Sequence, residues 1–298
     1  MNETVDHDGA RLRRPSAVSS LHLGATRVSY VPDGVVQLRP RGWLPSATER
    51  HWAEYADHLN DTGHLVAGIG GLLVERGERA LLIDTGFGPT YVPEEPDHPL
   101  TGAIHGGALL DNLARLGRDP AEIEAVAFTH LHTDHVGWAC RQPQAFTAAT
   151  FFVPAAEWNG RRRGDAGGAV AGREVTPALL DRLAPRLRLV RAGEEIFPGV
   201  RVTSLPGHTA GHAGYTVSSG GQRLIAFGDL LHSPLQIRHP EWPAPPDRDP
   251  GQAADHRRRL VNELTRTDTL GFGLHFPDVV FGRARCGASG AAVWHPEL

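Results

Sequence analysis

A short histidine-rich run at residues 130–135 constrains the fold of this chain more than any other feature. An apolar, strand-like segment is followed by the letters THLHTDHVG, so three imidazoles and a carboxylate fall close together. Burying four such groups without partners would be costly. Because alternate residues of an extended segment point the same way, His130 and His132 face one point, and Asp134 and His135 face a second point nearby. The run predicts ligands for two cations that prefer imidazole and carboxylate.

Three later turns each contribute one further residue of ligand type. They contain Pro206-Gly207-His208, Gly228-Asp229 and Gly273-Leu274-His275, and each comes after an apolar segment. Glycine and proline mark turns, and loops held by a rigid scaffold commonly carry catalytic and binding residues. We therefore expect these three turns to meet the histidine run at one end of a sheet.

Composition excludes several other classes of protein. The chain has 298 residues and a formal net charge of −4, so it lacks the basic excess of a dedicated nucleic-acid surface. No apolar run approaches the roughly 18 residues that a membrane helix needs, and no secretory signal is recognisable. Two cysteines cannot form a disulfide framework or a cysteine zinc cage. We expect a cytoplasmic protein that binds neither nucleic acid nor a membrane.

The pattern along the chain predicts mixed strands and helices without an internal repeat or a linker. Residues 1–20 are polar, rich in arginine and aperiodic, and we expect a mobile tail there. Residues 21–298 are expected to form a single domain. Early in this domain, a turn is predicted at Pro32-Asp33-Gly34, and Ser46 is expected to cap a helix that runs to about Leu59.

Two later segments give further expectations. Residues 160–172 hold several arginines and glycines and are predicted to form a flexible surface loop. Residues 253–265 show the clearest amphipathic helix, and the run Arg257 to Arg259 is expected on its exposed side. Among the histidines outside the predicted metal ligands, His212 is expected to be structural.

Five motifs in order resemble those of the metallo-β-lactamase superfamily. They are Asp84-Thr85-Gly86, the run from His130 to Gly137, His208 within a Pro-Gly-His-Thr-x-Gly-His string, Asp229, and His275. The resemblance extends from about residue 65 to residue 277. It implies the α+β class and a four-layer αβ/βα sandwich, in which two mixed β-sheets are flanked by helices and a dinuclear metal site lies between the sheets.

The resemblance also implies a ligand for each metal position. The first metal would be bound by His130, His132 and His208, the second by Asp134, His135 and His275, and Asp229 would bridge both. Asp84 is expected to orient a ligand or to shape its turn rather than to bind metal. The implied cofactor is a pair of divalent ions, with zinc as first choice and manganese, iron or cobalt left open.

Within the superfamily, two segments look most like the branch that contains methyl parathion hydrolase and quorum-quenching lactonases. These are Gly228 to His232 and Leu274 to Pro277. Trp138 stands where many members have a second glycine, and Trp158 matches the branch's habit of an aromatic residue after the second strand. Trp138, Trp158 and His232 are therefore candidates for the substrate pocket, although core packing of the two tryptophans and a purely supporting role of His232 stay open.

The function that this resemblance implies is hydrolysis by a metal-bridging hydroxide. The expected substrate is a small ester-like molecule, with a lactone or carboxylic ester as first choice and a phosphotriester or thioester open. Asp134 is expected to pass a proton to the leaving group. Two alternatives remain: an iron-dependent redox or tailoring enzyme of a biosynthetic pathway, and a class B3-like β-lactamase, although that class usually lacks the bridging aspartate. The partner is a small molecule, and a homodimer is left open.

Overall fold

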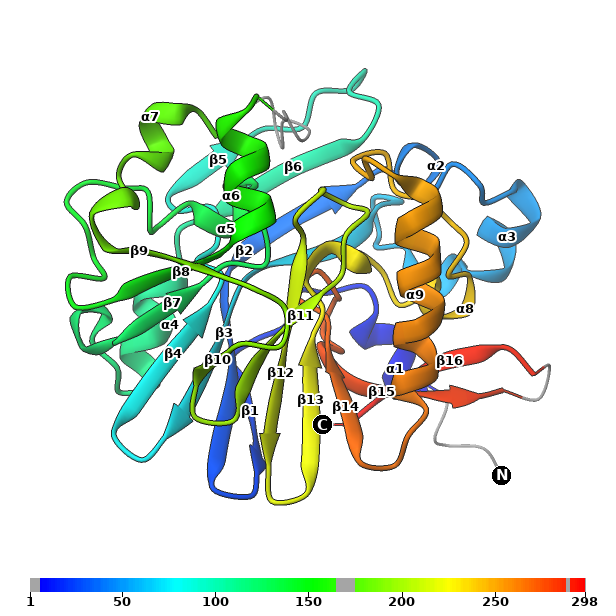
Figure 1. Ribbon diagram of the computed structural model, residues 1–298. Helices are drawn as coiled ribbons and strands as arrows, with labels where there is room; N and C mark the ends of the chain where they lie inside the picture. The colour runs from blue at the N-terminus through cyan, green and yellow to red at the C-terminus, as the bar shows by residue number, and fades with distance from the viewer. Residues whose placement is uncertain (1–5, 165–174, 288–289, 298) are drawn as a thin grey trace.

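Two β-sheets lie against each other, and helices cover their outer faces in the computed structural model (Figure 1), which describes residues 6–164, 175–287 and 290–297. Within these residues the first sheet has nine strands, in the order β5-β6-β2-β3-β4-β7-β8-β9 with β1 beside β2. Their bounds are β1 Ser19–Leu23, β2 Thr26–Leu38, β3 Leu65–Arg76, β4 Arg79–Ile83, β5 Thr90–Val92, β6 Thr101–Gly106, β7 Ala125–Ala127, β8 Thr150–Pro154 and β9 Leu187–Val190.

The second sheet comes from the later part of the chain. Its seven described strands lie in sequence order, from β10 to β16. Their bounds are β10 Glu195–Phe197, β11 Val200–Ser204, β12 Ala213–Ser219, β13 Gln222–Ala226, β14 Thr269–Phe272, β15 Phe281–Cys286 and β16 Ala292–Pro296. Both sheets mix parallel and antiparallel pairs, as the sequence predicted: β4 pairs with β7 and β13 with β14 in parallel, whereas the long β2 and β3 are antiparallel.

The helices are short, apart from one. They are α1 Asp6–Arg11, α2 Pro40–Trp43, α3 Glu49–Glu54, α4 Leu109–Arg115, α5 Thr133–Val136, α6 Ala155–Arg162, α7 Pro177–Leu180, α8 Leu235–Arg238 and α9 Pro250–Leu264, with 3-10 turns η1 Ala56–His58, η2 Pro120–Glu122, η3 Ala184–Arg186 and η4 Gly228–Leu230. In the described part of the chain, no helix combines the length and apolar character needed to cross a membrane.

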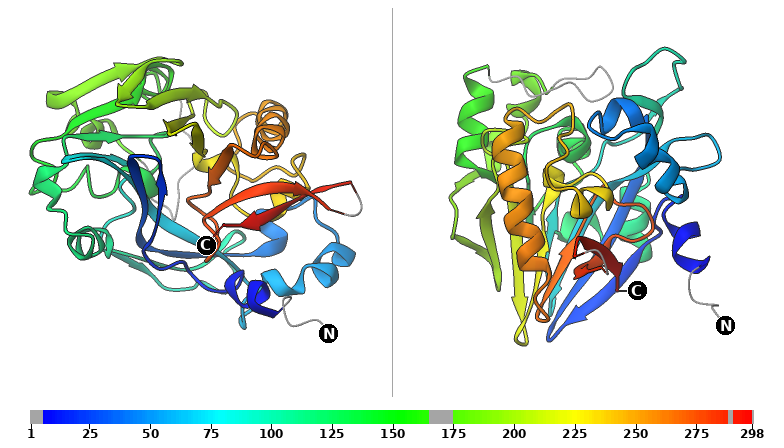
Figure 2. Two further views of the ribbon diagram at one scale, coloured as in Figure 1. Left: turned by 90° about the horizontal axis from the view of Figure 1, so that it is seen from below. Right: turned by 90° about the vertical axis from the view of Figure 1, so that its right-hand side faces the viewer.

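The alternation of side chains along β3 explains how the layers stack. Leu72 and Val74 point into a core shared with the second sheet, where they join Tyr215. Leu73 points the other way and packs with Leu113 of α4. Because successive side chains of a strand face opposite sides, one apolar strand supplies two cores. With α9 on the outer face of the second sheet (Figure 2), this confirms the predicted four-layer sandwich.

Helix α9 closes the second sheet and corrects one prediction. The Asp249 carboxylate caps its first turn by accepting from the Gln252 backbone N–H, and Leu260 and Leu264 pack onto the sheet. Arg257 was expected on the exposed side, yet it is fully buried. Its spacing of three residues before Leu260 places it on the inward face of the helix, where a buried acidic group, Asp247, pairs with it.

The N-terminal expectation is also corrected. Residues 1–5 lie outside the described residues, but within the predicted tail α1 occupies Asp6–Arg11 and β1 begins at Ser19. The Asp278 carboxylate lies 2.8 Å from Nε of Arg14 and 3.5 Å from Nε of Arg11, and the Asp278 backbone N–H donates to the carbonyls of both. Because Asp278 is so distant in sequence, its contacts with Arg11 and Arg14 leave no periodic pattern from which order in this segment could be predicted.

The turn predicted at residues 32–34 is wrong, because β2 continues through it with a bulge. Asp33 is the reason, since its buried carboxylate accepts five N–H groups from neighbouring loops: Phe87 and Gly88 at Oδ2, and Gly107, Leu109 and Trp138 at Oδ1, at 2.7–3.1 Å. A bulge aims a side chain differently from regular pairing. Here the bulge directs the Asp33 side chain into the interior, where its carboxylate binds the N–H groups of three segments.

Two further boundaries differ from the sequence prediction. The helix expected from Ser46 to Leu59 is shorter, since α3 begins at Glu49 after a Thr48 cap whose partner in the capping box is His51, and η1 follows separately. Helix α6 extends into the loop predicted for residues 160–172, and residues 165–174 lie outside the described residues.

Candidate metal centre

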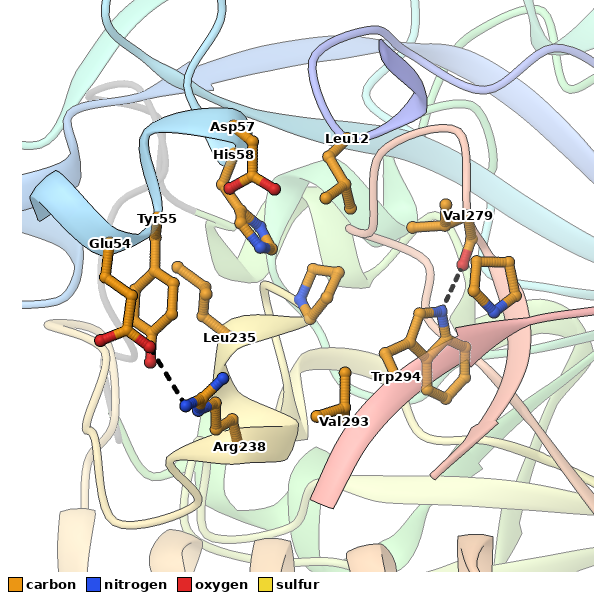
Figure 3. Close-up of a pocket in the computed structure, with 12 residues that line it drawn as sticks. Leu12, Glu54, Tyr55, Asp57, His58, Leu235, Arg238, Val279, Val293 and Trp294 are labelled. Atoms are coloured by element: carbon orange, nitrogen blue, oxygen red, sulfur yellow. Dashed lines mark hydrogen bonds and ion pairs between the residues drawn. The ribbon is translucent and has the colours of Figure 1, made fainter. Parts of the chain in front are cut away.

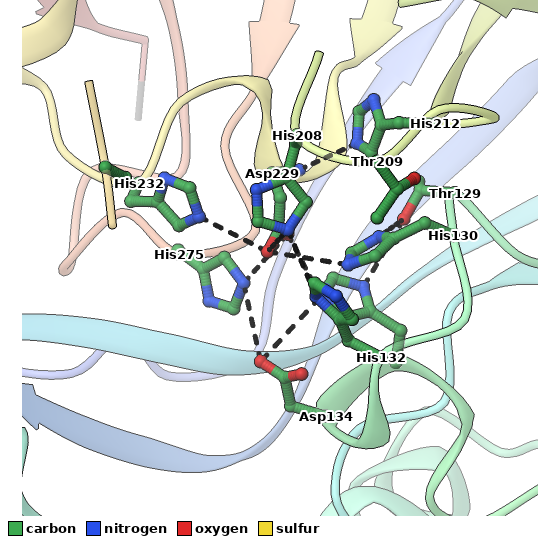
Figure 4. Close-up of polar contacts among 12 residues, drawn as sticks. Thr129, His130, His132, Asp134, His208, Thr209, His212, Asp229, His232 and His275 are labelled. Carbon is green, nitrogen blue, oxygen red and sulfur yellow. Dashed lines mark hydrogen bonds and ion pairs between the residues drawn. The ribbon is translucent and has the colours of Figure 1, made fainter. Parts of the chain in front are cut away.

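The structure brings all seven predicted ligands to one edge of the two sheets (Figure 4). They form two buried groups, and within each group the candidate ligand atoms lie within 4.8 Å of one another. The first group is His130, His132, His208 and Asp229; the second is Asp134, His135 and His275. The donors are imidazole nitrogens and carboxylate oxygens, which suit metal ions of the zinc type.

Strand ends bring these residues together. The segments that carry them follow β7, β11, β13 and β14, all at their carboxyl ends. Since β13 and β14 are parallel and Ala226 is paired with Phe272, the chain leaves both strands at the same level. Asp229 and His275 therefore come from neighbouring loops, and β7 supplies the histidine run from the facing sheet.

The histidine run ends in a single helical turn that is held by the Asp84-Thr85-Gly86 loop. His132 precedes α5, and Asp134 and His135 lie in its first turn. The Thr85 backbone N–H and hydroxyl both donate to the His135 carbonyl, at 2.7 and 2.9 Å. A side chain at Gly137 would come within 2.2 Å of the Phe87 backbone, so the close approach of the two loops requires glycine there.

Asp229 lies between the two groups. Its Oδ1 is 3.0 Å from Nε2 of His135 and 3.0 Å from Nε2 of His275, both in the second group. Its Oδ2 is 3.3 Å from Nε2 of His208 in the first group. One carboxylate thus presents one oxygen to each group. Its position is fixed from behind, because the Asp229 backbone N–H donates to Nε2 of His212.

Four histidines have their Nδ1 atoms held by neighbouring oxygens. Nδ1–H of His135 donates to Asp84 at 2.9 Å, that of His275 to the Gly68 carbonyl at 2.7 Å, and that of His130 to the Thr129 hydroxyl at 3.1 Å. Nδ1–H of His208 faces Asp247 Oδ1 at 3.3 Å. Such partners fix the proton on Nδ1 and leave the lone pair of Nε2 free to bind a metal.

Asp84 lies behind this centre rather than in it, as expected from the sequence. Besides His135, its carboxylate accepts from the Thr129 backbone N–H and hydroxyl, both at 2.9 Å. Its backbone has φ of 62°, which is rare for a residue other than glycine. The carboxylate thereby reaches two segments of the histidine run at once.

Several buried polar atoms of the centre have no hydrogen-bond partner among the described residues. They include Nε2 of His130 and Oδ1 of Asp134. Leaving such atoms unpaired in the interior is costly. A set of converging lone pairs is instead what a bound cation would satisfy, so the residues present fit metal ions.

The charges around the candidate ligands also favour cations. Burial, followed by neighbouring positive charge, holds the pKa of His130 and His132 well below the usual value, so both are neutral at pH 7. Burial alone would lower the pKa of His135, but the carboxylates of Asp229, Asp84 and Asp134 outweigh it and raise the pKa. The second group therefore attracts positive charge strongly.

The family follows from the match to known sequences. The sequence model of the metallo-beta-lactamase superfamily matches residues 72–269. The chain belongs to this superfamily. An N-acyl homoserine lactonase of a Bacillus species is 26% identical over 150 residues, which cover 47% of this chain and 54% of the lactonase. The chain thus spans about half the length of this curated relative.

Solved structures agree on the superfamily fold. AidC, a dizinc quorum-quenching lactonase, has a TM-score of 0.79 at 23% identity, with 95% of this chain and 98% of AidC covered. The hydrolase AbOPH has a TM-score of 0.77 at 21% identity, with 96% and 99% covered. At these identities the likeness concerns the fold. Together with the sequence match, it supports the superfamily fold, and the His/Asp groups give this fold a candidate metal site.

The residues that line the cavity beside the candidate ligands differ in part from those expected. A cavity of about 30 Å³ borders His132, Asp134 and His275, and its apolar wall is formed by Val36, Leu38, Trp43 and Ala67. His232 lines it as predicted, and its ring meets Trp43 edge-on with centroids 5.4 Å apart. Trp43, on the short helix after β2, was missed because nothing in its spacing marks it.

The two tryptophans proposed for the pocket do not line it. Trp138 and Trp158 are half-buried and pack against the core on the α4 side of the first sheet. Trp138 also donates from Nε1 to Asp33 at 2.7 Å, which turns its ring away from the cavity. Core packing, the alternative that the sequence left open, holds for both.

A larger cavity of about 340 Å³ (Figure 3) is lined by none of the candidate metal ligands. Residues of η1, α8 and β16 line it, and an ion pair between Arg238 and Glu54 crosses its rim at 3.1 Å. No residue borders both this cavity and the one at the metal centre. The candidate ligand groups found in the described residues lie elsewhere, so its size does not make it the reaction site.

His212 makes the metal-free protein sensitive to acid. Its Nδ1–H donates to the Leu205 carbonyl and its Nε2 accepts from Asp229, so only the neutral ring fits, in agreement with the structural role expected. Burial, above all, lowers its pKa to about 3. Because the unfolded chain binds this proton at higher pH, the stabilisation is present above pH 6.5 and is lost as pH falls toward 3. We expect a loss of about 2 kcal/mol between pH 7.5 and pH 5 from this group.

Urea unfolding of the EDTA-treated protein at these two pH values measures the effect, with His212→Gln as the matched variant. Glutamine keeps a polar side chain but is not protonated in this pH range. The free energy of unfolding of the variant should depend less on pH than that of the parent protein. Equal pH dependence in the two proteins would contradict the assignment.

Proposed function

We propose that the chain is a dinuclear metal-dependent hydrolase that opens small lactones or related carboxylic esters. The observation that carries the proposal is the position of Asp229, whose two oxygens face the two ligand groups at 3.0 and 3.3 Å. A carboxylate between two sets of histidine nitrogens is what a bridged pair of cations requires. A single cation would leave one of these oxygens and two histidines without a role.

The proposed ligands follow the two groups. His130, His132 and His208 would hold the first ion, Asp134, His135 and His275 the second, and Asp229 both. When bound, the ions supply a hydroxide at neutral pH and polarise the carbonyl of the substrate. Zinc is the proposed metal, because the donors are mainly imidazole with a minority of carboxylate.

Asp134 has the geometry for proton transfer to the leaving group. Its Oδ2 lies 3.8 Å from Nε2 of both His135 and His275, on the side of the second ligand group. Its Oδ1 is buried and has no hydrogen-bond partner in the part of the chain that is described. One oxygen can therefore serve as a ligand while the other accepts a proton and returns it to an alkoxide.

His232 is proposed to contact the substrate. Its Nε2 lies 3.3 Å from Asp229 Oδ2, and its ring stacks on that of His275 with centroids 5.6 Å apart. Burial lowers its pKa, so the ring is neutral at pH 7 and carries one N–H. With that N–H on Nε2, beside Asp229 Oδ2, the lone pair of Nδ1 is free to accept a hydrogen bond from the substrate and to orient it.

The cavity, at about 30 Å³, has room for no more than a small group, but the apolar side of its wall favours an uncharged substrate with an apolar part. Its wall of Val36, Leu38, Trp43 and Ala67 offers no charged partner, so burial of an acyl or alkyl group is favoured there. N-acyl homoserine lactones, the class named for the Bacillus relative, combine an ester carbonyl with such a chain. We therefore place lactones ahead of phosphotriesters and thioesters.

The proposal is tested by metal content and by turnover of a substrate panel. Protein purified without added metal is examined by elemental mass spectrometry and assayed on an acyl-homoserine lactone, an aryl ester, an aryl phosphotriester, a glutathione thioester and a cephalosporin. Two ions per chain with the lactone ahead is the expected result. One iron per chain without hydrolysis would instead indicate a redox enzyme, and turnover of the cephalosporin alone would indicate a β-lactamase.

Trp43 should determine which acyl chain is preferred. In Trp43→Ala the cavity gains the volume of an indole, so KM for a short-chain lactone should rise about tenfold while long-chain lactones are less affected. Metal content should stay at the parent value, since Trp43 is not a ligand. Steady-state kinetics over a series of chain lengths measures the change, with Trp158→Phe as the matched control outside the cavity. The idea fails if both variants keep the parental preference.

A further inference from the structure

We infer that Asp247 and Arg257 form a positioning pair that orients His208 and tunes metal affinity in the first ligand group but not in the second. The inference rests on the metal assignment proposed above and adds two residues to it. Neither residue is a candidate ligand, and neither was identified from the sequence, where Arg257 was expected on a solvent-exposed face.

Asp247 uses both of its oxygens. Oδ1 lies 3.3 Å from Nδ1 of His208, on the side of the ring opposite to the ligand group. Oδ2 accepts from the Ala244 backbone N–H at 3.1 Å and from the guanidinium of Arg257. The Asp247 side chain is fully buried. A buried carboxylate on Nδ1 fixes the tautomer with Nε2 free and makes that nitrogen a stronger donor to a metal.

Arg257 stabilises the negative charge of Asp247. It is fully buried, and besides Asp247 it donates from Nε to the Leu230 carbonyl at 2.7 Å and from Nη1 to the Trp242 carbonyl at 3.0 Å. Burying a guanidinium costs several kcal/mol unless its donors are matched. A leucine would fill this face of α9 as Leu260 and Leu264 do, so packing alone gives no reason for an arginine.

The same guanidinium connects two loops of the metal centre. Leu230 directly follows Asp229 in the 3-10 turn after β13, and Asp247 lies in the proline-rich segment before α9. By holding the Leu230 carbonyl and the Asp247 carboxylate together, Arg257 fixes the carboxylate behind His208 relative to the turn after β13. Helix α9 thereby influences the position of His208 although none of its residues is a candidate ligand.

The second ligand group is supported without Asp247. Its His135 is oriented by Asp84, whose other partners are the Thr129 backbone N–H and hydroxyl, and its His275 by the Gly68 carbonyl. Each group thus has one histidine held by a carboxylate, and only that of the first group depends on a cation from α9. Neutralising Asp247 should therefore weaken the first group selectively.

The test isolates each group by removing a ligand from the other. His275→Ala leaves the first group intact and His208→Ala leaves the second, and Asp247→Asn is introduced into both backgrounds. Zinc binding to the metal-free proteins is measured by competition with a chromogenic chelator, and cobalt absorption spectra report the coordination. We expect Asp247→Asn to weaken zinc binding about ten- to a hundredfold in the His275→Ala background and to shift its cobalt spectrum. In the His208→Ala background, neither should change.

Two results would overturn the inference. Equal zinc affinity with and without Asp247→Asn in the His275→Ala background would show that Asp247 does not tune the first group. Equal weakening in both backgrounds would show that it supports the whole protein rather than His208. Arg257→Gln, which removes the cation and keeps an amide donor, should reproduce the selective loss. If His275→Ala and His208→Ala bind no zinc at all, the proposed metal assignment itself is wrong, which is a different outcome.

Discussion

Replacement of Asp229 by alanine is expected to remove metal binding and hydrolysis together. This carboxylate presents one oxygen to His135 and His275 and the other to His208, so its loss leaves both groups incomplete and leaves Asp134 as the remaining carboxylate among five imidazoles. Since the ions supply several kcal/mol of transition-state stabilisation, kcat/KM should fall on the order of 10³-fold or more. Elemental analysis should find less than one ion per chain.

Two control variants show whether this result is specific to the Asp229 carboxylate. Asp229→Asn keeps the shape and the hydrogen bond of the backbone to His212, so its loss of metal would be due to charge alone. Asp181→Ala removes an exposed carboxylate that pairs only with Arg162 in the described structure, and should leave metal and rate unchanged. Full hydrolysis by a metal-free Asp229→Ala protein would contradict the proposed mechanism.

Replacement of Asp33 by alanine is expected to give the largest loss of stability. Five N–H donors converge on this carboxylate, among them the backbone N–H groups of Phe87 and Gly88 in the loop that holds α5 and the indole of Trp138. Removing the acceptor leaves these donors buried and unpaired, at a cost of about 3–5 kcal/mol in the free energy of unfolding. Urea titration followed by circular dichroism measures the loss.

Asp33→Asn serves as the graded control for that prediction. The amide keeps one acceptor oxygen but turns an NH₂ group toward donors, so its loss should lie between zero and that of Asp33→Ala. The metal ligands themselves are untouched in both variants. If Asp33→Ala lost less than about 1 kcal/mol, water would have to reach this site and the buried acceptor would have little energetic weight.

The clustering of the candidate ligands could be predicted from the sequence because its information is local. The histidine run and the turns at His208, Asp229 and His275 each follow an apolar strand. Burial of their imidazole and carboxylate groups costs free energy unless a partner such as a metal ion binds them. The structure brings the same residues together, with Asp84 behind His135. The sandwich followed from the resemblance that these motifs carry.

What could not be predicted depends on contacts across the fold. Asp33 carries the turn signal of its Pro-x-Gly context, and only pairing of β2 with β3 shows that it is a buried acceptor instead. Arg257 belongs to a run of three arginines, and its burial follows from a partner that lies ten residues earlier in an irregular segment. Trp43 borders the cavity because α2 folds back over β2, whereas Trp138 and Trp158, nearer the ligands in sequence, pack elsewhere.

The division of the candidate ligands between two sheets bears on when, during synthesis of the chain, a metal site could form. During translation the His130–His135 run emerges with the first sheet, well before Asp229 and His275 exist. A nascent chain at that stage would contain only part of the candidate ligand set. The bridging carboxylate and the last histidine arrive only with β13 and β14, so selection of the correct ion is deferred until the second sheet has docked. In the proposed enzyme, metal identity would then be decided by the folded protein and the metal pools of the cell rather than at the ribosome.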